Sequence, residues 1–157
     1  MRKMFQSMCK EWAAENPDVM IVSADFGFAA FDDIPARQKL IIGPMEQAAV
    51  GLCAGLSMGG RLPILYSITP FIIERAFEQI KLDLVRQGQR CLIVTFDDYP
   101  GAGPTHRAIN PGLMCDMMHL PYWEPQTMAD CNTALLMAYR RVRDEKKTAF
   151  VRLGLPK

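Results

Sequence analysis

The sequence predicts one α/β domain over residues 1–157, built as a three-layer sandwich with a mainly parallel central sheet and helices on both faces. Two observations lead to this fold class. Short apolar runs of strand length alternate with longer helical patterns along the whole chain. No linker, internal repeat or low-complexity tract divides the chain, and 157 residues suffice to bury the core of one domain.

The first part of the chain predicts two helices separated by two strands. In residues 2–15, apolar side chains recur at helical spacing, and the pattern stops at Pro17. The β-branched run 19–23 predicts a buried strand, and residues 39–42 predict a second, shorter one. Residues 45–58 are helical up to a Gly-Gly pair that breaks the pattern.

The middle of the chain predicts a strand, a long helix and another strand. Residues 62–66 form an apolar strand pattern. Residues 70–86 predict one long amphipathic helix that begins with Pro70, where a missing N–H costs nothing. Residues 91–96 are a strongly apolar strand, and a loop rich in Gly, Pro and Asp follows it to about residue 110.

The last part continues the same alternation. A short helix is expected at 111–118 and a weak strand near Tyr122. Residues 126–143 predict a further helix, and 148–153 predict the final strand. Strands that alternate with helices in this way predict a mainly parallel sheet with helices on both faces.

Composition excludes several classes of function. The formal net charge of +1 gives no electrostatic basis for binding nucleic acid or an anionic membrane. No apolar run reaches the ~20 residues that a membrane helix needs. Acidic residues occupy the N-terminal segment where a secretory signal would be apolar, so none is expected. The five cysteines show no metal-type spacing and predict reduced core thiols, in a cytoplasmic protein, with no metal site.

Glu46 is the one ionisable residue in the stretch IIGPMEQAAVGLCAGLSMGG. A carboxylate in the first turn of a helix can simply complement the helix dipole, which is worth about 0.3–1 kcal/mol. However, Gly51 and Gly55 each cost a soluble helix about 1 kcal/mol, which indicates that another backbone packs very close to it. A tightly docked helix would bury its own carboxylate, and a buried carboxylate needs a partner or a chemical role.

Three side chains are expected at the carboxyl edge of the sheet, where parallel α/β sheets bind ligands. They are Glu46, Phe71 and His106, each in a connection that follows a different predicted strand. An aromatic residue such as Phe71 is more often part of the core. However, Arg75 and Gln79 lie on the same helix face at i+4 and i+8, and Arg75 indicates that this face meets a polar group. His106 lies in a loop, where a core histidine is rare, whereas His119 is interpreted as structural.

These segments together resemble a known family. The stretches GPMEQAAVGLCAGLSMGGRLPILY, TPFIIERAFEQIKLD and GAGPTHRAINPGLMCDMMHLP are similar to the pyrimidine-binding domain of transketolase-type thiamine diphosphate enzymes. That group includes transketolase, 1-deoxyxylulose-5-phosphate synthase and the beta subunit of 2-oxoacid dehydrogenases. The likeness covers nearly the whole chain.

The resemblance implies a role for each matching residue. Glu46 matches the glutamate that hydrogen-bonds N1′ of the aminopyrimidine of thiamine diphosphate and promotes its imino tautomer. Phe71 matches the aromatic residue that stacks on the pyrimidine, and His106 matches the histidine that contacts the substrate. Asp25 corresponds to an acid near the cofactor. Arg75 is implied either in substrate binding or in bracing the interface.

The sequence also departs from the family. Relatives hold the diphosphate through Mg²⁺ in a separate domain with a Gly-Asp-Gly motif, and no Gly-Asp-Gly occurs here. We expect the C-terminal domain found in most transketolases to be absent as well. The segment Arg107–Asn110 stands where relatives commonly have acidic residues. The resemblance therefore implies a partner chain that carries the diphosphate-binding domain and the Mg²⁺, in an α2β2 assembly.

Three functions remain open from the sequence. The first is one half of a split transketolase-like enzyme that transfers a two-carbon ketol unit and is active only with its partner. The second is a component of a 2-oxoacid decarboxylase or dehydrogenase. The third is a non-catalytic structural subunit of such a complex, which the joint presence of Glu46, Phe71 and His106 argues against.

Overall fold

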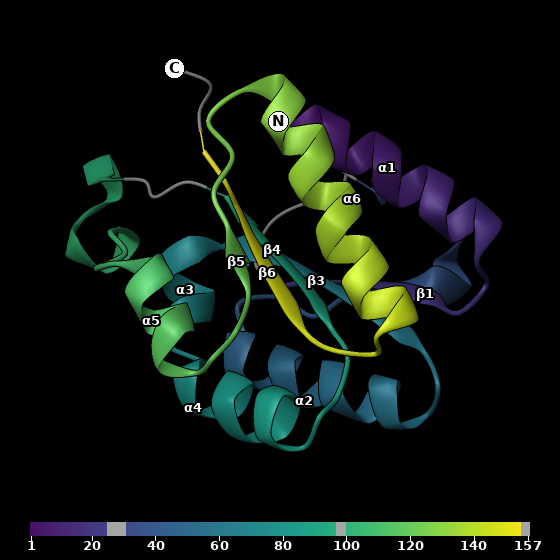
Figure 1. Ribbon diagram of the computed structural model, residues 1–157, viewed down its shortest axis with the longest axis horizontal. Coiled ribbons are helices and arrows are strands. Elements are labelled where there is room, and N and C mark those ends of the chain that lie inside the picture. Colours follow the sequence, from purple (N-terminus) through teal and green to yellow (C-terminus); the bar gives the residue numbers. More distant parts are fainter. Residues whose placement is uncertain (25–30, 97–99, 155–157) are drawn as a thin grey trace.

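The computed structural model of the chain describes residues 1–24, 31–96 and 100–154. These residues form a six-stranded sheet in the order β2-β1-β3-β4-β6-β5, and every pair of neighbouring strands is parallel. Helices cover both faces of this sheet (Figure 1). The predicted three-layer α/β sandwich is confirmed.

The strands are β1 (Val19–Ser23), β2 (Lys39–Ile41), β3 (Leu62–Ile68), β4 (Leu92–Phe96), β5 (Tyr122–Trp123) and β6 (Ala149–Leu153). The α-helices are α1 (Arg2–Glu15), α2 (Glu46–Met58), α3 (Thr69–Ile73), α4 (Phe77–Gln79), α5 (Pro111–Met117) and α6 (Met128–Asp144). A π-helical segment, Ile80–Arg86, continues α4, and short 3-10 turns lie at Ala36–Gln38, Pro100–Ala102 and Pro104–His106.

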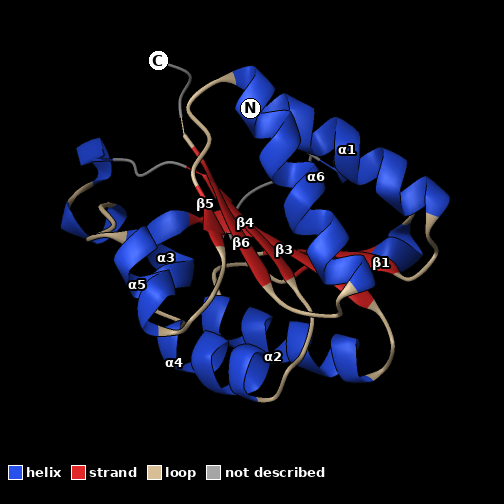
Figure 2. Cartoon of the chain, in the orientation of Figure 1, coloured by secondary structure: helices blue, strands red, loops and turns tan. Residues whose placement is uncertain are grey.

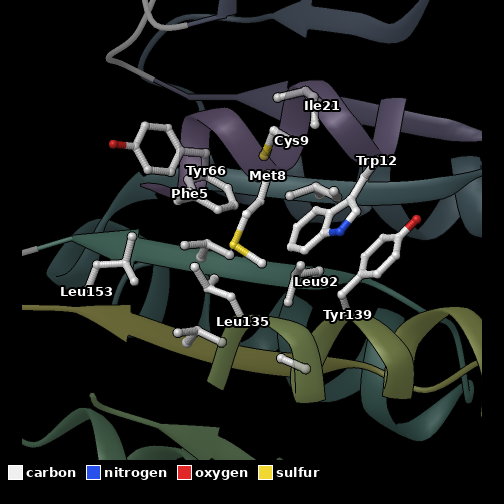
Figure 3. Close-up of a cluster of buried hydrophobic side chains, with 14 of the residues drawn as sticks. Phe5, Met8, Cys9, Trp12, Ile21, Tyr66, Leu92, Leu135, Tyr139 and Leu153 are labelled. Carbon is white, nitrogen blue, oxygen red and sulfur yellow. The ribbon is translucent and has the colours of Figure 1, made fainter. Parts of the chain in front are cut away.

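The helices divide into two layers (Figure 2). Helices α1 and α6 cover one face, where Trp12 and Tyr139 stack with ring centroids 4.1 Å apart. Figure 3 shows this core, in which Phe5 and Met8 lie beside Leu135 over the sheet. Helix α2, the helices after β3 and helix α5 cover the other face, over a second buried cluster. Burial on both faces explains why the central strands β3 and β4 are apolar and fully buried along their length.

The prediction of one continuous helix over residues 70–86 is wrong. The sequence predicts one helix over 70–86, but the structure divides it into α3, a turn at residues 74–76, and α4 with its π-helical extension. Ala76 has φ −105° and ψ 21°, outside the helical region, which separates the two parts. The apolar residues on either side remain buried, so the hydrophobic pattern survives the break. The turn places Glu74 and Arg75 outside a regular helix.

The cysteines are buried free thiols, as the sequence predicts. Burial raises the pKa of the Cys9 and Cys53 thiols well above the ordinary value and that of Cys115 to about 12. Among the described residues, no helix has the length and apolar character needed to cross a membrane.

Candidate active site

Glu46 opens helix α2 directly after the turn that leaves β2. Gly43 makes this turn possible with φ +72°, a conformation that L side chains rarely adopt. Glu46 is 1% exposed, so its burial, expected from the sequence, is confirmed. Its Oε2 accepts a hydrogen bond from Arg75 Nη1 at 2.7 Å. Its Oε1 is buried with no hydrogen-bond partner among the residues that the structure describes.

Phe71 lies in helix α3, which begins where β3 ends. Thr69 fixes this start, because its hydroxyl donates to the carbonyl oxygen of Phe96 at 2.6 Å and so joins α3 to the end of β4. Pro70 occupies the first turn, where it needs no hydrogen-bond acceptor. Phe71 is buried but retains 8% exposure at the carboxyl edge of the sheet. The position of Phe71 is therefore set by the ends of β3 and β4, to which the start of its short helix is attached.

Arg75 connects Phe71 to Glu46. Its guanidinium carbon lies 4.3 Å from the centroid of the Phe71 ring, while its Nη1 donates to Glu46. The arginine side chain is 43% exposed and that of Glu46 is fully buried. One half-exposed cation therefore neutralises a carboxylate that water does not reach.

His106 approaches the same aromatic ring from a separate loop. Gly103, with φ +106° and ψ −177°, turns the chain into the 3-10 turn that carries the histidine. The His106 ring centroid lies 4.8 Å from that of Phe71, with the planes at 70°. Thr105 Oγ1 lies 3.1 Å from His106 Nδ1 and can fix the ring's orientation. His106 is half-buried, so part of the residue remains accessible to solvent.

The structure thus brings Glu46, Phe71, Arg75 and His106 into one contiguous group. Gln79 does not share a straight helix face with Phe71 and Arg75, because the turn at 74–76 interrupts the helix. Asp25, the expected acid near the cofactor, lies outside the described residues.

His119 is exposed and lies elsewhere, beside a separate cavity of about 230 Å³ that Leu84 and Arg141 also line. Within the described ranges, no cluster of three or more His, Cys, Asp or Glu side chains could hold a metal ion. The chemistry-bearing side chains are therefore concentrated at the carboxyl edge, around Phe71.

Glu74 is a residue of this region that the sequence did not single out. It lies in the turn between α3 and α4, and its Oε1 accepts a hydrogen bond from the backbone N–H of Ile109 at 2.7 Å. Asn110 then caps α5 by accepting from Leu113 N at 3.0 Å. The loop that carries His106 is therefore fixed just beyond the histidine. The sequence gives no signal for this role of Glu74 except that it is next to Arg75.

Glu74→Ala should release the amide of Ile109 without unfolding the domain. A hydrogen bond of this kind contributes about 0.5–1.5 kcal/mol, so exchange of that amide should accelerate up to about tenfold. Hydrogen exchange measured by NMR on the chain checks this. Glu74→Gln keeps an acceptor oxygen and should retain protection, while Glu78→Ala, an exposed neighbour in α4, serves as a control. Unchanged exchange in Glu74→Ala would contradict the anchoring role.

Comparison with known proteins agrees with this geometry. The family model described as "Transketolase, pyrimidine binding domain" matches residues 1–154. An apulose-4-phosphate transketolase subunit of Actinobacillus succinogenes is 30% identical over 94 residues, covering 57% of this chain and 30% of that protein. The 6-deoxy-6-sulfo-D-fructose transketolase subunit of Clostridium sp. is 24% identical over 144 residues, covering 85% of this chain and 44% of that protein.

A solved structure titled "Split gene transketolase, inactive beta4 tetramer" has the same fold, with a TM-score of 0.83 and 22% identity, and matches 99% of this chain and 52% of that chain. The chain spans less than half the length of the two transketolase subunits named above. The family match covers the whole sheet and all four residues of the candidate site. The chain therefore belongs to the family of transketolase pyrimidine-binding domains.

Proposed function

We propose that this chain is a subunit of a split, thiamine diphosphate-dependent transketolase-like enzyme, in which it supplies the glutamate that activates the cofactor. The observation that carries the proposal is Glu46 Oε1, a buried carboxylate oxygen with no partner among the described residues. Arg75 links this carboxylate to the ring of Phe71, which His106 also contacts. The relatives whose names include "transketolase subunit" support ketol transfer as the reaction.

The residues present fit the aminopyrimidine of thiamine diphosphate. Glu46 Oε1 offers the acceptor that a ring nitrogen carrying a proton would need, and Phe71 offers an aromatic surface for a flat ring. When bound, the cofactor supplies the nucleophile and the electron sink for carbon–carbon bond chemistry. Asp25 remains a predicted contact, since it lies outside the described residues.

The side chains of this chain would then act around the bound ring. Glu46, shielded from water, would share a proton with the pyrimidine nitrogen that it faces. His106, half-buried and beside Phe71, lies where it could hold or donate a proton at a substrate oxygen. Arg75, with 43% of its side chain exposed, would supply positive charge toward an incoming substrate.

A partner chain would complete the site by holding the diphosphate and Mg²⁺. The outer face of α2 supports this, since Gly51 and Gly55 are exposed and a Cβ built on either would meet no described atom within 4 Å. The close approach expected from the sequence is therefore not made within the described part of this chain. Two exposed apolar side chains flank the same helix, Met45 at 53% and Met58 at 69%. We assign this face to the partner, in an α2β2 assembly.

The test is the product formed by the complex reconstituted with its partner. We expect two-carbon transfer from a ketose donor to an aldehyde acceptor, followed by chromatography of the product sugars. Release of CO2 from a 2-oxoacid without any transfer from a ketose would instead identify a decarboxylase or dehydrogenase component. A complex that neither binds thiamine diphosphate nor turns over would identify a structural role for the chain.

Calorimetry on the chain without its partner gives a second expected result. Thiamine diphosphate should bind it weakly, because the described residues offer contacts for the pyrimidine but no metal cluster for the diphosphate. Addition of the partner and Mg²⁺ should produce tight binding. Tight binding by this chain alone would contradict the division of the site between two chains.

A further inference from the structure

The guanidinium of Arg75 already contacts both residues that the chain offers to a pyrimidine ring, Glu46 and Phe71. We propose that Arg75 occupies the place of the pyrimidine in the cofactor-free chain and has to leave it when the cofactor binds. This inference rests on the proposed function and concerns the order of events at the same site. It gives Arg75 a task distinct from substrate binding or interface bracing.

The geometry of one side chain carries the inference. Arg75 Nη1 donates to Glu46 Oε2 at 2.7 Å, and the guanidinium carbon lies 4.3 Å from the Phe71 ring centroid. A flat group that lies over the aromatic ring while donating to the buried carboxylate makes contacts of the same two kinds that an aminopyrimidine would make, although through Oε2 and not through Oε1, which has no partner among the described residues. Both groups would compete for the surface of the Phe71 ring beside Glu46.

The location of Arg75 in the chain allows it to move. It lies in the turn at residues 74–76 between α3 and α4, and its side chain is 43% exposed. A half-exposed arginine on a turn can move its charge into water, where it is well hydrated, once another hydrogen-bond donor takes its place at Glu46. Glu46, at 1% exposure, cannot move in the same way. The arginine is therefore the mobile partner of the pair.

The Arg75–Glu46 ion pair stabilises the chain in the absence of the cofactor. A carboxylate buried without a counter-charge is strongly destabilising, and Arg75 supplies the counter-charge among the described residues. The same pairing lowers the apparent affinity for the cofactor, since only the fraction of molecules with Arg75 displaced can bind. Removing the guanidinium should therefore lower the stability of the chain without cofactor and increase its affinity for the cofactor. A residue that merely braces Glu46 against the bound ring would have the opposite effect on affinity.

The experiment measures thiamine diphosphate binding to the reconstituted complex by calorimetry. Arg75→Met keeps a flexible apolar stem but donates no hydrogen bond, and we expect its Kd to fall about tenfold if the arginine occupies the site in nine molecules of ten. Arg75→Lys keeps the positive charge but lacks the flat guanidinium. Its Kd for thiamine diphosphate should lie between those of Arg75→Met and the wild type. Arg140→Met, an exposed arginine of α6 in the other helical layer, should leave the Kd unchanged.

Thermal unfolding of the chain without cofactor provides the second readout. Arg75→Met should lower the melting temperature, and added Mg²⁺, partner and cofactor should restore more stability to this variant than to the wild type. A Kd that rises or stays unchanged in Arg75→Met, with normal binding by the wild type, would overturn the inference alone. If Arg75→Met fails to fold, the Kd of Arg75→Lys decides in the same way. Absence of binding by the wild-type complex would overturn the proposed function and this inference together.

Discussion

Glu46→Gln should lower the turnover of the reconstituted complex by about a hundred- to ten-thousand-fold, the range that positioned proton transfer contributes. Glutamine has nearly the same shape as glutamate, so its amide oxygen can still accept from Arg75 in place of the carboxylate oxygen at 2.7 Å. It cannot exchange a proton with the pyrimidine nitrogen. The loss should therefore appear in kcat, while the Kd for the cofactor changes far less.

Steady-state kinetics with a ketose donor measures this effect, and thermal unfolding checks that the variant is folded. The matched control is Glu78→Gln, a glutamate in the first turn of another helix that is exposed rather than buried. Turnover of Glu46→Gln equal to the wild type would defeat the catalytic assignment. A loss shared equally by both variants would point to the partner interface rather than to the chemistry.

The fold was largely predictable because the strands are short apolar runs separated by helical patterns. In a parallel sheet, the connections that follow successive strands meet at one edge, and this rule alone placed Glu46, Phe71 and His106 together. The ring contact between Phe71 and His106, with centroids 4.8 Å apart, confirms their proximity. Residues 35 positions apart in the sequence thus became neighbours through topology, without any local signal.

The interruption at residues 74–76 could not be predicted from the same pattern. Ile72, Ile73, Ala76 and Ile80 are all buried, so their spacing is compatible with one continuous helix. The turn is distinguished by its tertiary contacts: Glu74 reaches Ile109 across 35 residues of chain, and Arg75 reaches Glu46 across 29. Side-chain reach of this kind leaves no periodic signal in a sequence. The Arg75–Glu46 pair, central to the site, was accordingly missed.

The glycines of α2 concern a prediction that the described part of this chain does not fulfil. Glycine lowers the stability of a helix, so the two glycines predict that another backbone packs close to α2. In the described structure, however, Gly51 and Gly55 are exposed, and a Cβ built on either would have no atom within 4 Å. A sequence can record the requirements of an assembly as well as those of one chain. The proposed partner interface on α2 would meet the requirement that the described chain leaves open.

Substituting Gly51 should move stability and association in opposite directions. Gly51→Ala should stabilise the chain without its partner by about 1 kcal/mol, because alanine replaces the least favourable ordinary helix residue at an open position. Gly51→Leu should also fold, since the same space is open to solvent. In the complex, however, an isobutyl group would force the two surfaces apart at a cost of about 1–3 kcal/mol.

That cost corresponds to a partner Kd raised about tenfold to a hundredfold. Analytical ultracentrifugation or surface plasmon resonance measures the Kd, and chemical denaturation of the chain measures its stability. Asn132→Leu places the same side chain on an exposed position of α6, in the other helical layer, and should leave association unchanged. Normal partner affinity in Gly51→Leu would exclude the face of α2 as the interface. A glycine kept in a helix at a thermodynamic cost, with no described atom beside its open side, is the residue that a close interface on this face would require.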